Sequence, residues 1–394
     1  MPRMEPAAIT GMGCVCALGA DTGCAARGLG EGGRQLAPAS ALSPIALDYP
    51  FLAVPDMVWP EGRRTGWASD TLHLAGLAAR EALGMAGLAD GRGAAVLCGT
   101  TTGTALHFLD GYSVCRNGGA PGPDCQAYLD SDPALALAAA LGADGPVLTL
   151  SNACTSGADA VGMGLDMLRC GMASRVLCGG ADAMSLVSHT GFARLMLADT
   201  GPCRPFDAHR QGLNLGEGAA FLVLEHPAAA RARGAEILGF VRGFGAHADA
   251  HHFTAPHPEG EGLAHSVTDA LEQAGLKAGD LAFVNVHGTG TRENDRVEGR
   301  TLSRLLPGVP LWASKGLTGH TLGAAGAIEA VFTLLALRRG IVPKSAGFAE
   351  QDPDIGASPT MTDLPVSSPS ALSTSLGFGG GNAALILSTE AGHD

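Results

Sequence analysis

Residues 149–157, Thr-Leu-Ser-Asn-Ala-Cys-Thr-Ser-Gly, place a cysteine between a predicted strand and a predicted helix. The apolar run 147–150 predicts the strand, and the small residues of 157–168 predict the helix. Cys154 therefore lies near a helix N-terminus, where free backbone N–H groups and the helix dipole favour a thiolate. Such a cysteine can attack a carbonyl carbon, and the same N–H groups can hold the resulting oxyanion. A small buried cysteine that only packs gives the same local pattern.

Two histidines stand in glycine-rich loops and decide between these interpretations. His287 directly follows the apolar run 281–286 and precedes Gly-Thr-Gly-Thr at 288–291, while His320 ends the loop 314–320. Two histidines in loops of this kind, together with a cysteine at a strand-to-helix turn, indicate one shared active site.

These motifs, in this order, resemble the β-ketoacyl-[acyl carrier protein] synthases of the Cys-His-His elongating type, in the thiolase superfamily. Further matching segments lie at 9–13, 204–207, 216–219, 249–256, 377–382 and 385–387. The resemblance implies an α/β protein with the thiolase fold, a five-layer αβαβα arrangement of two similar halves. We place these halves at residues 1–232 and 233–394. The family is dimeric, and we expect the sheets of two subunits to pair near the predicted strand 174–178.

The implied enzyme is an acyltransferase that joins two thioesters. Cys154 takes an acyl group from acyl carrier protein, and malonyl-carrier protein then loses CO2 and attacks the acyl-cysteine. The resemblance implies an oxyanion hole from the backbone N–H groups of Cys154 and Phe378. It implies that His287 and His320 face the malonyl thioester carbonyl. No cofactor is implied, because the substrates travel on the phosphopantetheine arm of the carrier protein.

Buried charges are implied beside this centre. In the family, a lysine at the position of Lys315 pairs with a glutamate at the position of Glu329. The pair can be a structural salt bridge, or it can tune the electrostatics of the active site. Asp295 and Glu298 match carboxylates that fix the loop after His287.

The implied substrate-binding residues are Thr289, Thr291, Thr254, Thr102, Phe206 and Gly379. Thr289 and Thr291 match hydroxyls that hold the phosphopantetheine arm, although threonines in such loops also form local turns. Thr254 is expected at the entrance, and Thr102 stands where fatty-acid elongating relatives have a larger apolar gate residue.

Four positions depart from the usual family pattern: Thr102, Gln211, Arg292 and Leu376. Arg292 stands where the family usually has proline, Gln211 replaces a commoner aspartate, and Leu376 replaces a commoner phenylalanine. The segments 151–156 and 212–217 resemble the synthases of bacterial aryl-polyene-type pathways more than housekeeping fatty-acid enzymes. We therefore expect a polyunsaturated or aryl acyl chain.

Composition excludes several other classes of protein. The net charge of −13 argues against nucleic acid as a partner. It also means that an acidic carrier protein must dock on a local basic patch; the candidates are Arg63, Arg64, Arg204, Arg210, Arg292 and Arg296.

The ten cysteines form no metal or disulfide pattern, and His251, His252 and His257 lack further ligands, so we expect no metal. Without an apolar run of about 18 residues or a signal-peptide core, we expect no membrane association and a cytoplasmic location.

Three other functions remain open at this point. A chain-length-factor-like subunit would lack the nucleophile, whereas a catalytic subunit that needs such a partner would keep it. A thiolase would need a second cysteine near the C-terminus, and the last cysteine here is Cys203. An acyltransferase that loads without condensing would show the same motifs. The partner subunit can be a second copy of this chain or a chain-length-factor-like protein.

Overall fold

The computed structural model describes residues 4–43, 47–59, 68–103, 109–120 and 132–392. Two candidate docking residues, Arg63 and Arg64, lie outside these ranges. The Gly, Pro and Asp residues of 110–132 predict a loop or lid, and residues 121–131 of that segment also lie outside the described ranges. Within the described ranges, strands and helices alternate as the sequence predicts.

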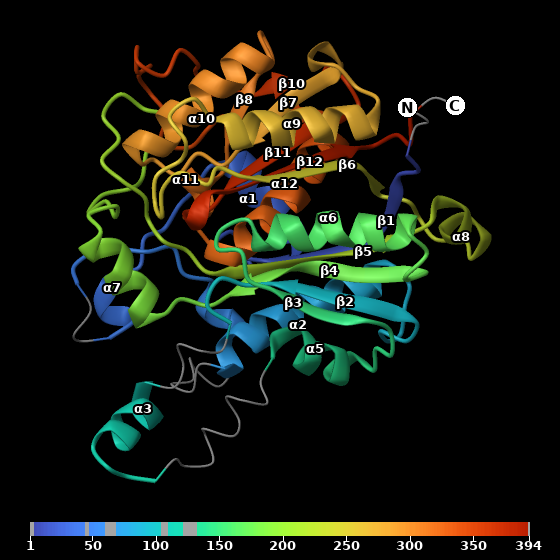
Figure 1. The fold of residues 1–394 in the computed structure, drawn as a ribbon, viewed down its shortest axis with the longest axis horizontal. Helices are drawn as coiled ribbons and strands as arrows, with labels where there is room; N and C mark the ends of the chain where they lie inside the picture. Colours follow the sequence, from blue (N-terminus) through green and yellow to red (C-terminus); the bar gives the residue numbers. More distant parts are fainter. Residues whose placement is uncertain (1–3, 44–46, 60–67, 104–108, 121–131, 393–394) are drawn as a thin grey trace.

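Ten strands of the described residues form one hydrogen-bonded sheet that consists of two halves (Figure 1). The strands of the first half are β1 (Ala7–Val15), β2 (Ala94–Gly99), β3 (Val147–Leu150), β4 (Arg175–Asp182) and β5 (Gly218–Glu225). Those of the second half are β6 (Gly239–Ala248), β7 (Leu281–Val286), β8 (Leu311–Ala313), β11 (Ser370–Leu376) and β12 (Gly381–Ser388).

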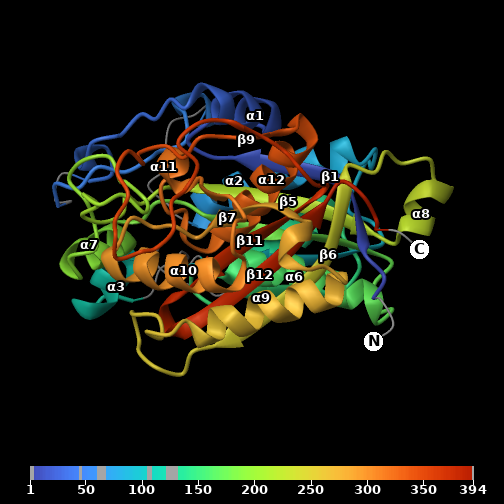
Figure 2. The same ribbon diagram turned by 90° about the horizontal axis from the view of Figure 1, so that it is seen from above.

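The two halves have the same topology. The order is β3-β2-β4-β5-β1 in the first half and β8-β7-β11-β12-β6 in the second. In each half the first three strands are parallel, the fourth is antiparallel to the third, and the fifth is antiparallel to the fourth. The halves meet where Ala7 of β1 pairs with Val241 of β6. Because β12 also pairs with β6, the first residues of β1 and the last of β12 lie at the same end of the molecule (Figure 2).

Helices fill the layers between and outside the two halves of the sheet (Figures 1 and 2). The inner layer consists of α6 (Ser156–Arg169) and α12 (Ala325–Arg339). The outer layers consist of α2 (Ala68–Met85) and α5 (Pro133–Leu141) on the first half, and of α9 (Glu261–Ala274) and α10 (Arg292–Leu305) on the second. This arrangement confirms the predicted five-layer αβαβα fold.

Small residues allow the two inner helices to pack closely. A Cβ atom at Gly157 of α6 would lie 2.7 Å from the carbonyl oxygen of Gly323, and one at Gly326 of α12 would lie 2.7 Å from Ala158. The side chains of α12 are buried from Ala325 to Leu337, as expected for a helix covered on all sides. Glycines at these two positions therefore allow the close packing of the central layer.

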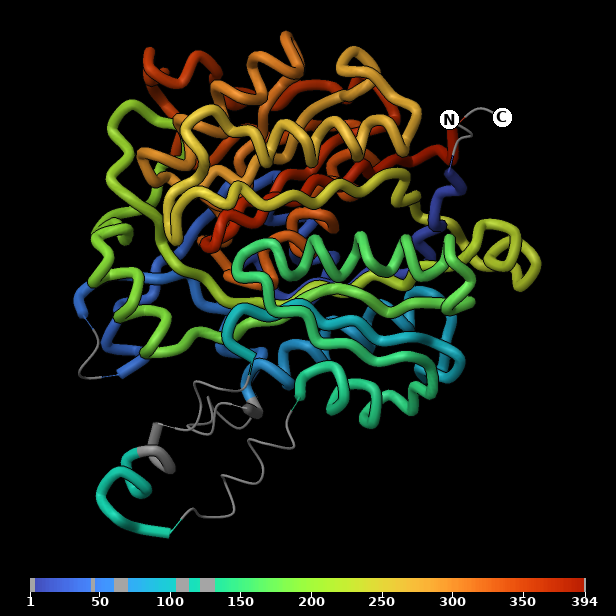
Figure 3. Tube along the Cα trace, viewed as in Figure 1, coloured from blue at the N-terminus to red at the C-terminus, as the bar shows by residue number. Residues whose placement is uncertain are grey.

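Further elements lie at the edges of the layers. They are α1 (Thr22–Glu31), α3 (Leu109–Arg116), α7 (Leu186–Arg194), α8 (Pro227–Ala232), α11 (Lys315–Thr318) and the strand pair β9 (Ile341–Val342) and β10 (Leu364–Pro365). Helix α3 stands apart from the packed layers (Figure 3). Among the described residues, no helix is both long enough and apolar enough to cross a membrane.

Several local predictions were wrong. The loop predicted from Asp110 does not begin there, since residues 109–116 form helix α3, which includes Asp110 and Gly111. The sequence predicts a helix over 71–83 with Asp70 as its N-cap, but α2 begins at Ala68. Asp70 therefore lies in the first turn, where its charge still faces the positive end of the dipole. The sequence predicts a strand over 235–242, whereas β6 begins at Gly239, because pairing with β1 begins there.

The predicted pairing of two subunits along the strand 174–178 was also wrong. That segment belongs to β4, which is hydrogen-bonded to β2 on one side and to β5 on the other. A strand with both edges occupied cannot pair with another subunit. The outer strand of this half is β3, which ends four residues before Cys154.

Candidate functional site

Cys154 lies in a tight turn between β3 and α6. Ala153, the preceding residue, has a φ of +49°, an uncommon conformation for a residue with a side chain. The turn is closed by Ser156, whose hydroxyl accepts a hydrogen bond from the Asn152 N–H (2.8 Å) and donates one to the Ala153 carbonyl (2.6 Å). The strained turn places Cys154 at the end of the strand, as the sequence predicts.

Burial governs the ionisation of Cys154, whose exposed fraction is 4%. Desolvation raises the pKa of the thiol to about 11, although the charge of Lys315 and a hydrogen bond from the Phe378 backbone N–H oppose this shift. The sequence suggested that the helix N-terminus would favour a thiolate. In the structure the loss of solvation outweighs the favourable charges, so Cys154 rests as a thiol.

The two histidines lie face to edge beside this cysteine. The ring centroids of His287 and His320 are 5.1 Å apart, and the rings are nearly perpendicular at 86°. Burial, and then the charge of Lys315, hold both pKa values well below the ordinary histidine value. Both imidazoles are therefore neutral at physiological pH, and each carries a single N–H donor.

Lys315 connects His287 to Glu329. Its ammonium group lies 3.1 Å from Nδ1 of His287 and forms an ion pair with the Glu329 carboxylate. Since an ammonium group can only donate, Nδ1 of His287 accepts, and the proton of His287 is on Nε2. Burial raises the pKa of Glu329, and the Lys315 charge opposes this effect. The pair is thus a buried salt bridge that also sets the tautomer of a histidine in the site.

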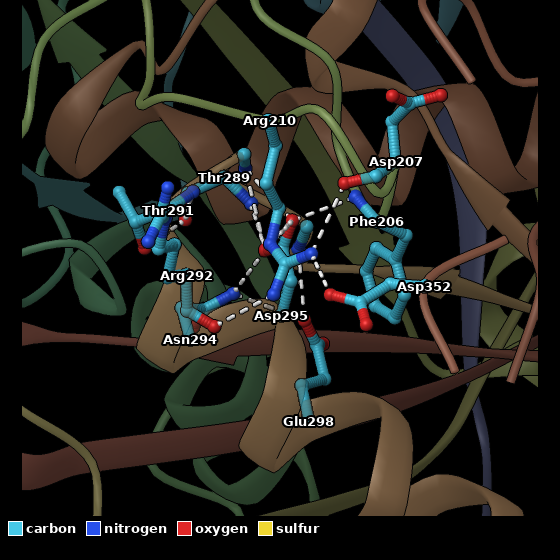
Figure 4. Close-up of polar contacts among 12 residues, drawn as sticks. Phe206, Asp207, Arg210, Thr289, Thr291, Arg292, Asn294, Asp295, Glu298 and Asp352 are labelled. Carbon is cyan, nitrogen blue, oxygen red and sulfur yellow. Dashed lines mark hydrogen bonds and ion pairs between the residues drawn. The ribbon is translucent and has the colours of Figure 1, made fainter. Parts of the chain in front are cut away.

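Two buried carboxylates hold the loop after His287 (Figure 4). Glu298 accepts hydrogen bonds from the backbone N–H groups of His287 (2.7 Å) and Gly288 (2.8 Å). Asp295 accepts from the N–H groups of Thr289 (3.0 Å) and Gly290 (3.1 Å). These contacts agree with the prediction that Asp295 and Glu298 fix loop geometry.

A cavity of about 550 Å³ joins most of the predicted residues. Its walls include Cys154, His287, His320, Phe378, Thr254, Thr289 and Thr291. Lys315 and Glu329 do not line the cavity; Lys315 contacts His287 from the side of Glu329, with which it forms an ion pair. The hydroxyls of Thr289 and Thr291 are 2.8 Å apart, so the two threonines also bond to each other.

Three predicted substrate-binding residues do not line this cavity. The Thr102 hydroxyl donates to the Asp182 carboxylate (3.0 Å). Phe206 is fully buried beneath the Gly288 loop, and its N–H donates to Asp295 (2.7 Å). Gly379 donates its N–H to the carbonyl of Phe253 (2.8 Å).

Comparison with known proteins agrees with this geometry. Residues 62–230 match the family model of the β-ketoacyl synthase N-terminal domain, and residues 238–349 match that of the C-terminal domain. A 3-oxoacyl-[acyl-carrier-protein] synthase 2 of Mycobacterium bovis is 36% identical over 304 residues, which cover 74% of this chain and 73% of the relative. The chain belongs to the β-ketoacyl synthase family.

Two further proteins are similar to this chain. The ketoacyl synthase alpha subunit of the tetracenomycin polyketide synthase of Streptomyces glaucescens is 40% identical over 62% of this chain and 61% of its own. The solved ishigamide ketosynthase/chain length factor superposes with a TM-score of 0.87 at 30% identity, covering 98% of this chain and all of the other. The predicted family and reaction class are confirmed.

The structure changes the set of arginines that can dock a carrier protein on this synthase. Arg210 is buried, and its guanidinium donates to the carboxylate of Asp352 (2.5 Å) and to the backbone carbonyl of Arg292 (3.1 Å) (Figure 4). It is therefore a structural cation and not a docking residue. Arg204 and Arg292 are exposed, whereas Arg296 forms an ion pair with Glu293 at 2.5 Å.

Sequence reasoning missed two residues of the synthase site. Phe192 of α7 lines the cavity and stacks on Phe378 with ring centroids 5.3 Å apart. Nothing in the local sequence of α7 distinguishes this side chain. Asp182, at the end of β4, accepts hydrogen bonds from the backbone N–H groups of Thr101 (2.8 Å) and Gly323 (2.7 Å). A buried carboxylate after an apolar strand was a usable signal for this position.

Proposed function

We propose that the chain catalyses the decarboxylative condensation of malonyl-acyl carrier protein with an acyl group held as a thioester on Cys154. The observation that carries this proposal is the single cavity that joins Cys154 to His287 and His320, with Lys315 behind them. The reaction requires no cofactor beyond the phosphopantetheine arm of the substrates.

In the first half-reaction, Sγ of Cys154 attacks the carbonyl carbon of the acyl thioester. The new C–S bond replaces the C–S bond to the pantetheine sulfur, which leaves as a thiol with the proton that Cys154 loses. The backbone N–H groups of Cys154 and Phe378 are the proposed donors to the oxyanion. The contact of the Phe378 N–H with the Cys154 sulfur supports this role.

In the second half-reaction, malonyl-carrier protein loses CO2 as its C–C bond breaks. The electron pair forms an enolate whose negative charge develops on the thioester oxygen. His287 can stabilise this oxygen through its Nε2–H, since Lys315 occupies Nδ1. The enolate carbon then attacks the carbonyl of acyl-Cys154 and a C–C bond forms. The C–Sγ bond breaks, and Cys154 leaves as a thiolate that takes a proton from solvent to return to the resting thiol. Neutral histidines suit this step because they donate hydrogen bonds without protonating the enolate carbon.

We also propose that a second ketosynthase-type chain binds along the edge strand β3. Leu148 of β3 is 43% exposed and Leu135 of α5 is 58% exposed, and no strand of the described residues pairs with the outer edge of β3. The occupant can be an identical chain or a chain-length-factor-like subunit, as in the ishigamide ketosynthase/chain length factor. Native mass spectrometry of the chain alone tests the first case.

The proposed activity is tested by intact-mass spectrometry. Purified protein is mixed with acyl- and malonyl-carrier proteins, beside Cys154→Ala and the matched control Cys170→Ala, which removes an exposed cysteine at the far end of α6. We expect acylation and a β-ketoacyl product with the wild type and the control, and neither with Cys154→Ala. Acylation without condensation would favour a loading enzyme or a missing partner subunit. A panel of saturated, polyunsaturated and aryl chains tests the proposal of an aryl-polyene-type substrate.

A further inference from the structure

Arg292 is a cation at the open end of the active-site cavity. It lines the same cavity as Cys154, follows the Thr289–Thr291 hydroxyl pair in the chain, and is exposed to solvent. The cavity therefore runs from a buried nucleophile to an exposed guanidinium.

The backbone of Arg292 is held by the network of polar contacts in Figure 4. Arg210 donates to the Arg292 carbonyl (3.1 Å) while it is fixed by Asp352 (2.5 Å). Asp295 holds the N–H of Thr289, three residues earlier, at 3.0 Å. The base of the Arg292 side chain is thus positioned by buried charges, although its end is exposed.

No carboxylate in the described part of the chain neutralises this guanidinium. The neighbouring Glu293 is paired with Arg296 at 2.5 Å. Asp249, the other acidic residue of the cavity wall, accepts hydrogen bonds from Asn382 (2.9 Å) and from the His257 N–H (2.8 Å). In a chain with a net charge of −13, a positioned arginine at a cavity entrance that has no acidic partner among the described residues indicates an anionic ligand.

We propose that Arg292 binds the phosphodiester group of the phosphopantetheine arm when a carrier protein delivers its substrate. This inference rests on the proposed function and adds a specificity-determining residue to it. A thioester at Cys154 places the arm along the cavity and its phosphate at the exposed end. Arginine suits this position, since its planar guanidinium forms paired hydrogen bonds with two phosphate oxygens.

The test compares three acyl donors that share one acyl chain: acyl-carrier protein, free acyl-phosphopantetheine and acyl-pantetheine, which lacks the phosphate. The kcat/KM for acylation of Cys154 is measured by intact mass. We expect Arg292→Ala to lower the ratio of kcat/KM for acyl-phosphopantetheine over acyl-pantetheine by about ten-fold, the loss expected for one exposed charge-assisted contact. Arg292→Lys should keep part of the ratio. Arg304→Ala, an exposed arginine at the other end of α10, should keep all of it.

The remaining outcomes separate the possible failures. A loss with acyl-carrier protein alone would show that Arg292 contacts acidic side chains of the carrier, and it would overturn the phosphate assignment. An equal loss with all three donors would show a structural role and overturn it as well. A wild-type protein that none of the donors acylates would contradict the proposed function itself. Salt provides a second readout, because the wild-type ratio should fall as ionic strength rises.

Discussion

Nζ of Lys315 lies 3.1 Å from Nδ1 of His287 in a site where both side chains are buried. This contact fixes the proton of His287 on Nε2, and the Lys315 charge helps to keep the ring neutral. A residue that also forms a salt bridge with Glu329 thereby decides which hydrogen bond the histidine can offer to substrate.

The salt bridge and the tautomer effect can be separated by mutation. Lys315→Met leaves the Glu329 carboxylate buried without its partner, so we expect a loss of about 3–5 kcal/mol in the free energy of unfolding, measured with urea. Lys315→Met/Glu329→Gln removes the unpaired charge and should recover most of that stability while condensation stays slow. Recovery of both stability and condensation in the double variant would show that Lys315 has only a structural role.

His287 should be needed for decarboxylation more than for acyl transfer. In His287→Ala the enolate loses one donor, and we expect CO2 release from malonyl-carrier protein to fall by about 10²–10³. Acylation of Cys154 should continue, as followed by intact mass. His265→Ala, at an exposed position on α9, is the matched control. An equal loss in both half-reactions would place His287 in the acyl-transfer step too.

The reactivity of Cys154 should depend on pH well into the alkaline range. Because burial raises its pKa to about 11, the thiolate fraction should grow about ten-fold per pH unit between pH 7 and 10. Alkylation by iodoacetamide, located by peptide mass spectrometry, measures this rate, and the exposed Cys170 of the same protein serves as an internal reference. A plateau near pH 7 would instead show that the helix N-terminus stabilises the thiolate.

The depressed pKa values of His287 and His320 make folding stability sensitive to acid. Below about pH 6.5 the unfolded chain binds protons at these histidines that the folded protein does not. The free energy of unfolding should therefore decrease as the pH is lowered below about 6.5, by up to about 1.4 kcal/mol per pH unit for each histidine. Urea unfolding at pH 7.5 and 5.5 measures the slope. The double variant His287→Gln/His320→Gln should reduce the slope of unfolding free energy against pH. An unchanged slope would contradict the assignment of this acid sensitivity to the two histidines.

Packing of the inner helices can be tested with two glycines. Gly157→Ala places a Cβ 2.7 Å from the Gly323 carbonyl oxygen, so we expect destabilisation by about 1–3 kcal/mol. Gly84→Ala in α2 is the matched control, since nothing lies within 4 Å of its Cβ and alanine favours the helix by about 0.5–1 kcal/mol. Thermal unfolding of both variants gives the comparison, and equal stabilities would show that α6 and α12 can separate without cost.

The sequence alone determined the positions of the reactive residues along the chain. Cys154 and His287 each follow an apolar strand that the structure reproduces, β3 and β7, because strand ends are marked by local changes in hydrophobicity. The resemblance to β-ketoacyl synthases predicted the five-layer fold and the family. The structure confirms the fold and the comparisons confirm the family.

Only the tertiary structure decided how these residues behave. Arg210 and Arg292 are both arginines in polar segments, yet one is buried between carboxylates and the other is exposed at the cavity entrance. Likewise, Cys154 rests as a thiol because surrounding layers remove its solvent. Burial and pairing arise from segments far apart in the chain, such as Lys315 and His287. Local sequence patterns do not predict which of these distant segments come into contact, so they do not predict the burial and pairing that set the pKa values.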